Sequence, residues 1–422
     1  MRTLPLRVQP VEGEVVDSWL EALAARMRCA WGDLLVSVGL PAARGRTYTT
    51  GWLVAPTDQQ LEFMSVVTGQ SPTALNAMVL TRIAHQLDSP DIPHESVESM
   101  LWLSGRRSRF CPACLAENGG RWMLRWRLRW NFACLRHNCL LADTCPACQS
   151  PQRAVPASVA LIPIPGFCAH KLLGCHGRSV ARCGAQLSIA PVLQLAHDHP
   201  ILSAQQMIDA AVSTGVARTG IYAPAPVPAS ALVADLCALG GRILRYPNLD
   251  ELRRLTGDAV IAEFLTAKEE AAFSSRGVTA DSSAMASGIA SAAAGSILSA
   301  ASPAEAADRM RWLISFNRNN GLSVSATNIG WGRGISATLH STQLFALSSY
   351  LSVSDQLRYR TSSTTPRRPH PHGASERARW LPSLLWPAVW VSPLGWWGFG
   401  LEVDHVRAVP GVSVRASGWA IA

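Results

Sequence analysis

Paired cysteines constrain the fold of this chain more than any other feature of its sequence. Cys111-Pro-Ala-Cys114 is followed about twenty residues later by Cys134-Leu-Arg-His137. Two ligands separated by two residues let one tight turn aim both at the same ion, and two such turns complete a tetrahedron. Three thiolates and one imidazole suit zinc better than calcium or magnesium. The spacing therefore predicts a structural zinc site formed by Cys111, Cys114, Cys134 and His137.

A second zinc site begins at Cys145-Pro-Ala-Cys148. More candidate ligands follow than one ion needs, namely Cys168, Cys175, His176 and Cys183. The pair Cys183-Gly184 resembles the closing turn of a zinc ribbon, because glycine lets the backbone fold under the metal. We expect the ligands to be Cys145, Cys148, Cys168 and Cys183, with Cys175 in reserve. We expect His170 and His176 to lie exposed in loops, and Cys139 to be a buried free thiol.

Nothing in the sequence predicts catalysis at these metals. A catalytic zinc keeps one coordination position open and needs a general base nearby, whereas both expected sites have four protein ligands. The sequence contains no HExxH motif, no HxE motif upstream of the paired cysteines and no P-loop lysine motif. We therefore expect two structural zinc ions in a protein that is not an enzyme. A nuclease with carboxylates far apart in the sequence is the rival enzymatic interpretation.

Basic and aromatic residues alternate between the two halves of the first site. The stretch from Gly119 to Trp130 reads GGRWMLRWRLRW, and the whole chain carries a net charge of +9. Arginine binds phosphate oxygens through its forked guanidinium group, which suits a nucleic-acid partner. Alternatively, the tryptophans form the small core of the zinc module and the arginines are merely solvated. We expect a tryptophan core, and a DNA-binding surface made by Arg107, Arg121, Arg125, Arg127 and Arg129.

Most of the remaining sequence has helical periodicity. Apolar residues repeat at helical spacing from Glu14 to Met27. Between Thr57 and Leu80, an N-cap, the Thr68-Gly69 turn and a second N-cap at Ser71-Pro72 predict two helices joined by a glycine turn. This is the layout of a helix-turn-helix unit, although an ordinary helical hairpin fits equally well.

The predicted fold class is therefore mainly α with small zinc-ribbon or zinc-finger modules. We expect an N-terminal helix-turn-helix-like domain over residues 1–105 and tandem zinc-binding modules over residues 106–190. A helical region follows over residues 191–272, and the composition of residues 273–303, dominated by Ala, Ser and Gly, predicts a flexible connector or weakly packed helices. Residues 304–422 form a C-terminal helical region, whose tail from Trp396 onwards fits no pattern.

Neither end of the chain predicts export or membrane insertion. The first residues lack the apolar core of a signal peptide. The uncharged stretch from Leu381 to Leu401 is long enough to span a bilayer, but Pro382, Pro387 and Pro393 would break a single helix repeatedly. We expect a cytoplasmic, nucleoid-associated protein without a membrane span.

The order of these features resembles the TniQ family of transposition target-selection proteins. The resemblance covers about the first 190 residues and rests on Leu4-Pro5, Glu14, Ser18-Trp19, Thr68-Gly69, Arg109 to Leu115, Trp126-Arg127, Trp130, Cys134, His137, Leu141, Asp143, Cys145 to Cys148, and Cys183-Gly184. A looser similarity to the C-terminal part of longer members lies at Arg377-Ala378-Arg379 and from Leu381 to Pro387.

The resemblance implies a non-catalytic adaptor for DNA transposition. Proteins of this kind engage an AAA+ ATPase regulator of the TniB or TnsC type through their N-terminal helical part, with the zinc modules positioning it. Some members bind DNA themselves and others associate with an RNA-guided effector complex. A homodimer is also compatible with this role. The rival interpretation is a stand-alone zinc-ribbon and helix-turn-helix transcription regulator, which would bind DNA without any ATPase partner.

Overall fold

The computed structural model describes residues 3–41, 51–87, 107–154, 158–172, 181–272, 283–321 and 335–351. The chain divides into two compact units, residues 1–346 and 347–422. Within the described ranges the first unit is mainly helical, with two short antiparallel two-stranded sheets. The prediction of a mainly helical fold with two cysteine-rich clusters is confirmed. No helix in these ranges is both long enough and apolar enough to cross a membrane.

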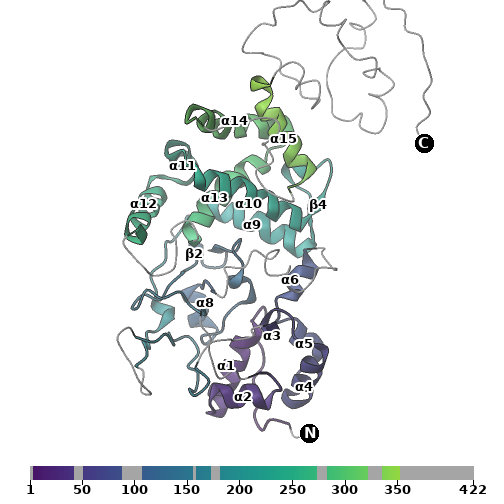
Figure 1. Ribbon diagram of the computed structural model, residues 1–422, viewed down its shortest axis with the longest axis vertical. Helices are drawn as coiled ribbons and strands as arrows, with labels where there is room; N and C mark the ends of the chain where they lie inside the picture. The colour runs from purple at the N-terminus through teal and green to yellow at the C-terminus, as the bar shows by residue number, and fades with distance from the viewer. Residues whose placement is uncertain are drawn as a thin grey trace, which may run out of the picture. The chain divides into compact units, whose positions relative to one another are not determined.

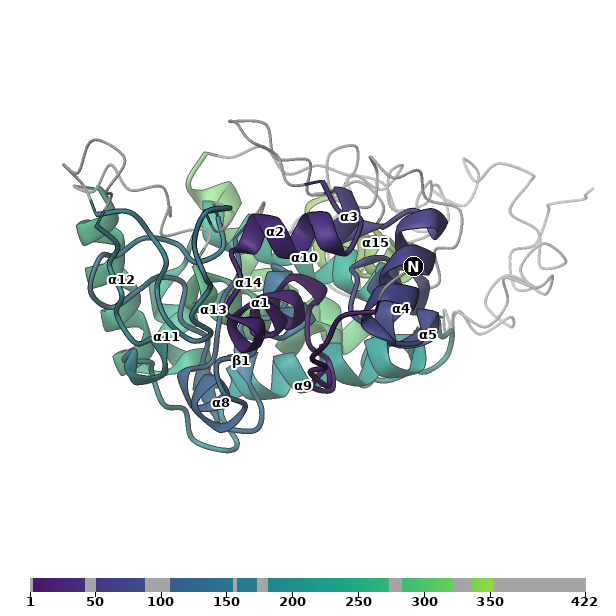
Figure 2. The same ribbon diagram turned by 90° about the horizontal axis from the view of Figure 1, so that it is seen from below.

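The N-terminal part is a group of short helices (Figure 1). They are α1 (Val16–Met27), α2 (Trp31–Ser37), α3 (Gly51–Val54), α4 (Asp58–Thr68), α5 (Pro72–Asn76) and α6 (Thr81–Gln86). Seen from below, α1 and α2 lie next to one another (Figure 2). Helix α1 forms because Trp19, Leu20 and Leu23 recur at helical spacing, and all three side chains are buried.

The pair α4 and α5 begins and ends where the sequence signals are. Thr57 and Gln60 form a reciprocal capping box at the start of α4. Gly69 ends α4 in the left-handed conformation, with φ of 71°, which costs glycine little. Ser71 then caps α5, whose first residue is Pro72. Helix α5 is only five residues long and ends at Asn76.

The cysteine-rich middle contains little regular structure. Its elements are α8 (Pro112–Glu117), η1 (Leu124–Arg127), β1 (Ala133–Cys134), β2 (Cys139–Leu140) and η2 (Leu187–Ile189). Aromatic side chains supply its core: Trp122 packs edge-on against Phe110 and Trp126, with ring centroids 5.4 and 5.9 Å apart. Trp122, Trp126 and Trp130 are all buried, which agrees with the tryptophan core expected from the sequence.

Three packed helices follow: α9 (Pro200–Thr214), α10 (Ala229–Arg245) and α13 (Ala284–Leu298), and Figure 1 shows them side by side. Helix α13 lies within the range 273–303, for which the sequence predicted a flexible connector or weakly packed helices. The structure corrects this prediction, because α13 is buried on almost every side. Its small residues allow close packing: a Cβ on Gly288 would lie 3.0 Å from Cγ2 of Ile201.

The remaining elements complete the described part of the chain. They are β3 (Val216–Ala217), η3 (Gly220–Tyr222), β4 (Val227–Pro228), α11 (Leu249–Thr256), α12 (Asp258–Ala272), α14 (Pro303–Asn319), α15 (Ala337–Leu347) and η5 (Ser348–Tyr350). The apolar stretch from Leu381 to Leu401 and the tail from Trp396 lie outside the described residues.

Candidate metal centres

The first cysteine cluster has the geometry of a tetrahedral metal site. The ligand atoms of Cys111, Cys114, Cys134 and His137 all lie within 4.8 Å of one another. The Sγ atoms of Cys114 and Cys134 are 3.7 Å apart, and His137 Nδ1 lies 3.3 to 3.5 Å from the three sulfurs. Tetrahedral zinc with Zn–S of about 2.3 Å and Zn–N of about 2.0 Å requires S···S of about 3.8 Å and N···S of about 3.5 Å. These donors therefore fit zinc.

Local backbone geometry aims these four ligands at one point. Cys111 immediately precedes α8, and Pro112 occupies the first position of that helix. Cys134 lies in β1, and Asn138, with φ of 47°, turns the chain back into β2. The chain therefore presents two adjacent turns, and each supplies two ligands.

Glu117 orients His137 from outside the ligand set. Its Oε1 lies 3.0 Å from His137 Nε2, so that Nδ1 faces the sulfurs. Burial lowers the pKa of His137, but hydrogen bonds to Glu117 and Cys134 outweigh it and raise that pKa to about 9. A carboxylate on the far nitrogen of a metal-binding histidine is a common supporting contact. The sequence analysis missed this role, because Glu117 lies twenty residues from its partner.

Cys139 lies beside the first cluster. It is buried, and its Sγ lies 3.9 Å from that of Cys111. The pairing of β1 with β2 places Cys139 opposite Cys134. Cys139 is thus a fourth sulfur, next to the three cysteine ligands and the one histidine ligand.

The second cluster brings together Cys145, Cys148, Cys168 and Cys183, all within 4.8 Å of one another. The Sγ atoms of Cys145 and Cys183 are 3.7 Å apart, as are those of Cys148 and Cys168. This spacing again matches tetrahedral zinc with four thiolates. Cys175 and His176 lie outside the described residues, and His170 is half-buried.

Two backbone features hold the second cluster. Gly184 has φ of 64°, which places it in the left-handed region expected after the last ligand. Its amide donates to the carbonyl of Cys168, while the amide of Cys168 donates to Ala185, at 3.0 and 2.9 Å. Gln152 Nε2 lies 3.6 Å from Cys168 Sγ, where it donates to a ligand sulfur.

Buried ion pairs connect the cysteine-rich middle to α1. Arg121 Nε lies 3.0 Å from Glu14, and Arg127 lies 2.5 Å from Asp17. Arg153 pairs with both Asp17 and Glu21 and lies over the ring of Trp122. Burial alone would raise the pKa of Asp17, but Arg127 and Arg153 lower it overall; burial raises the pKa of Glu21 to about 7.

The five arginines predicted to bind DNA do not form one surface. Arg121 and Arg127 point inward, where Glu14 and Asp17 bind them. Arg125 is 42% exposed and pairs with Asp209 of α9 at 3.2 Å. Arg129 is exposed and Arg107 is half-buried. The acidic partners, Asp17 in α1 and Glu14 just before it, could not be paired with these arginines from the sequence, because they lie more than one hundred residues away.

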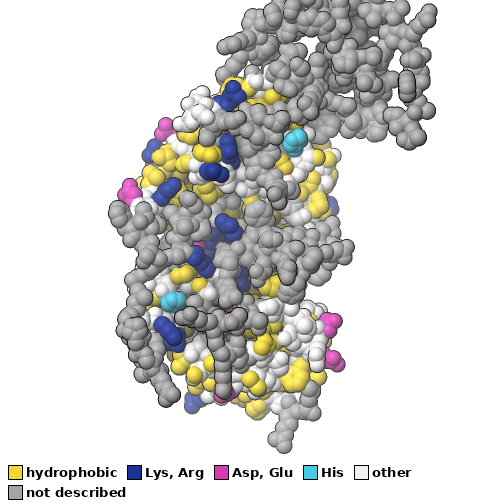
Figure 3. Space-filling view, in the orientation of Figure 1, with side chains coloured by type: hydrophobic (Ala, Val, Ile, Leu, Met, Phe, Trp, Pro, Cys, Tyr) yellow, Lys and Arg dark blue, Asp and Glu magenta, His cyan; other side chains and the backbone are white. Residues whose placement is uncertain are grey.

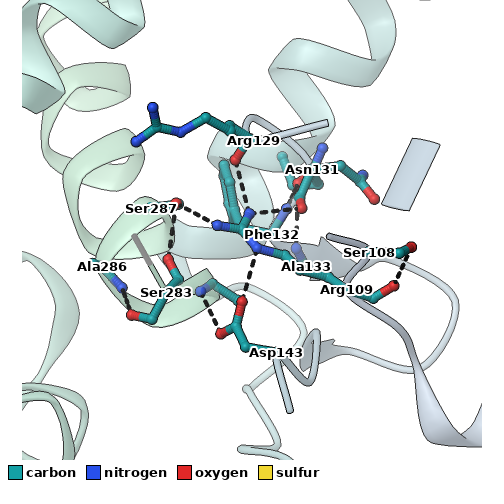
Figure 4. A network of polar contacts seen from close by, with 12 residues as sticks. Ser108, Arg109, Arg129, Asn131, Phe132, Ala133, Asp143, Ser283, Ala286 and Ser287 are labelled. Carbon is teal, nitrogen blue, oxygen red and sulfur yellow. Dashed lines mark hydrogen bonds and ion pairs between the residues drawn. The ribbon is translucent and has the colours of Figure 1, made fainter. Parts of the chain in front are cut away.

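Arg109 joins the first metal site to the helical layer (Figure 4). Its guanidinium group pairs with Asp143 at 3.1 Å and donates to the carbonyl oxygens of Arg129 and Asn131 at 2.8 and 2.9 Å. It also donates to Ser287 of α13 at 2.9 Å. The other oxygen of Asp143 accepts from the amide of Ala284 at 2.7 Å, at the first turn of α13.

Backbone pairing supports the same connections. The amide of Val15 donates to the carbonyl of Trp122, and the amide of Trp122 donates to Ser18. On the other side, Gln205 of α9 is buried and accepts from the amides of Phe132 and Ala133. The first cluster is therefore fixed between α1 and α9.

The comparison with protein families agrees with this organisation. The family model that matches is TniQ, over residues 5–141. No curated protein matches the chain. The matched segment contains α1 with its buried carboxylates and all four ligands of the first cluster, and it ends before Cys145. Residues 5–141 are thus a TniQ domain, which assigns this part of the chain to the TniQ family.

Proposed function

We propose that this chain is a non-catalytic adaptor of DNA transposition that helps to select the target site. In this role it links DNA, or a complex already bound to DNA, to an AAA+ transposition regulator. The observation that carries the proposal is the TniQ domain over residues 5–141. The ion pairs between α1 and the cysteine-rich middle support it, because they make the N-terminal helices and the first metal site one rigid part.

We infer that each cysteine cluster holds one structural zinc ion. The ligand atoms have the spacing that tetrahedral zinc needs, and each set is complete with four protein donors. A complete set favours a structural role over a catalytic one. Zinc would stabilise the folded middle of the chain, whose regular structure is otherwise limited to short elements.

DNA binding is assigned to the outward-facing arginines. Figure 3 shows Lys and Arg side chains along the middle of one face, whereas the Asp and Glu side chains lie mainly near its edges. Among the residues named from the sequence, Arg129 is exposed and Arg107 is half-buried. Phosphate contacts from such side chains give affinity without sequence preference. Arg121 and Arg127 instead hold α1 in place.

A pull-down against an AAA+ transposition regulator, with and without duplex DNA, tests the adaptor role. We expect the full-length zinc-loaded chain to retain the ATPase, and DNA to increase the amount retained. Retention of DNA but not of the ATPase would instead support the stand-alone transcription regulator. Loss of both would overturn the proposal.

Charge reversal tests the DNA surface separately. We expect Arg129→Glu to weaken duplex binding and to reduce its dependence on salt. Arg26→Glu, which makes the same charge change at an exposed position on α1, is the matched control. Equal effects of the two substitutions would show that only net charge matters and that Arg129 has no specific role.

A further inference from the structure

Exposed apolar side chains gather on the segment that carries the second cysteine cluster. Nine large hydrophobic side chains are exposed in the described ranges, and six of them lie between residues 161 and 189. We use the name apolar patch for five of these, which are Leu161, Ile162, Ile164, Phe167 and Ile189. Ile164 is 67% exposed and Ile189 is 73% exposed. Grouped exposure of this kind on a soluble protein marks an interaction site more often than scattered exposure does.

Backbone hydrogen bonds bring the two parts of the apolar patch together. The amide of Phe167 donates to the carbonyl of Ile164, and Phe167 forms an antiparallel bridge with Gln186. The amide of Leu187, at the start of η2, donates to the carbonyl of Gly166. Ile189 is the last residue of η2. The loop that bears Ile164 and the turn that bears Ile189 are therefore paired.

The backbone under the apolar patch is held in place. Pro163 and Pro165 flank Ile164 and fix their own φ angles. The carbonyl oxygens of Val159 and Leu161 accept from the amides at the start of α2, both at 2.8 Å. Because the backbone is constrained before binding, less conformational entropy is lost when a partner docks.

The sequence around the apolar patch has a single sign of charge. No Asp or Glu occurs between Asp143 and Asp198. Lys171 is exposed and Arg182 is half-buried. Their backbones form an antiparallel bridge, as those of Phe167 and Gln186 do. Arg153 is already neutralised by the carboxylates of α1. The segment that carries the apolar patch is therefore positively charged, and the neighbouring helix α2 adds one exposed carboxylate, Asp33.

We propose that the apolar patch is a docking site for a protein segment with an apolar face bordered by Asp and Glu. Branched aliphatic and aromatic side chains would bury that face, and Lys171 and Arg182 would meet its carboxylates. Two cations supply only about 2 kcal/mol of attraction to an anionic membrane, so a lipid surface fits less well. Duplex DNA would leave most of the apolar side chains uncovered. The inference concerns a second surface and does not depend on the transposition role.

Binding of synthetic peptides to the full-length zinc-loaded chain tests this inference. The probe is an amphipathic peptide with Leu on one face and Glu on the other, and its partner probe carries Lys in place of Glu. We expect the Glu peptide to bind and the Lys peptide to bind at least about tenfold more weakly. We expect Ile164→Asp and Ile189→Asp each to weaken binding of the Glu peptide at least about tenfold.

Val66→Asp is the matched control, because Val66 is 44% exposed on α4 and lies outside the segment that carries the apolar patch. Zinc content and circular dichroism establish that each variant is folded. Equal binding of both peptides, or no effect of Ile164→Asp in a folded variant, would overturn the proposal. Vesicle binding with the same sensitivity to Ile164→Asp would identify a lipid surface instead. Loss of self-association in that variant would identify a second copy of the chain, which also overturns it.

Discussion

Replacing Arg109 with lysine should destabilise the native state by about 2–6 kcal/mol, although the positive charge is retained. The guanidinium group of Arg109 reaches Asp143, the carbonyl oxygens of Arg129 and Asn131, and the hydroxyl of Ser287. A lysine ammonium group is a single point and cannot span these acceptors. If the lysine ammonium group stays with Asp143, the carbonyl oxygens of Arg129 and Asn131 lose their charged donor. Each loss should lower the free energy of unfolding by about 1–3 kcal/mol.

Arg109→Met should cost about 1–2 kcal/mol more than Arg109→Lys. It also removes the cation from Asp143, whose side chain is 22% exposed and therefore keeps some contact with water. Urea unfolding of the zinc-saturated protein, followed by tryptophan fluorescence, measures both differences. Amide hydrogen exchange in the first turn of α13 should accelerate in both variants, because Ser287 and Ala284 lie in this network.

The control for this experiment is Arg129→Lys. Arg129 contributes its backbone carbonyl to the same network, but its side chain is exposed, so the substitution should change stability by less than about 0.5 kcal/mol. If Arg109→Lys costs no more than Arg129→Lys, the guanidinium group does not join the metal site to α13, and the reasoning is refuted.

Three further predictions concern the metal sites and the buried carboxylates. Cys111→Ser should release about one zinc ion per chain and unfold the first site, because metal binding there contributes folding free energy. Elemental analysis of zinc checks this, with Cys29→Ser as the control. Full zinc content in Cys111→Ser would contradict the prediction. For Glu21→Gln, the free energy of unfolding relative to that of the parent should increase by up to about 3 kcal/mol as the pH rises from 5 to 8. The folded parent holds the Glu21 proton up to a pKa of about 7, against 4.5 when unfolded, so its stability falls across this interval; urea unfolding at both pH values checks this, and an unchanged difference would contradict it. Asp143→Asn should lower the free energy of unfolding by about 1–3 kcal/mol, because Arg109 then lacks its carboxylate partner. The same urea unfolding assay checks this, and a decrease below about 0.5 kcal/mol would show that the ion pair contributes little.

The helix ends that could be predicted from the sequence are those set by residues close to them in the chain. Thr57, Gly69 and Ser71 act within four residues of their own positions, so the starts and ends of α4 and α5 follow from the sequence. The eight candidate ligands follow from the CxxC and CxxH pairs together with Cys168 and Cys183, and the structure brings the same eight together in two groups of four.

Long-range partners explain what the sequence analysis missed. The arginines at 121 and 127 belong to a charged run in the sequence, but their partners lie in α1 or just before it, and only folding brings them together. Helix α13 has a composition typical of a connector, yet small residues are what close packing against α9 and α10 requires. Composition alone cannot distinguish a solvated Ala and Gly segment from a tightly packed one.

The charged network around α1 and Arg109 restricts how this chain can evolve by recombination. The TniQ match ends at residue 141, but Asp143, Arg153 and Gln205, which complete buried contacts of the matched segment, all lie beyond it. A recombination crossover at that boundary would separate buried acidic and basic side chains that neutralise one another in the folded protein. Exchange of the C-terminal half between homologous genes should therefore preserve folding only where these three partners are inherited with the segment they complete.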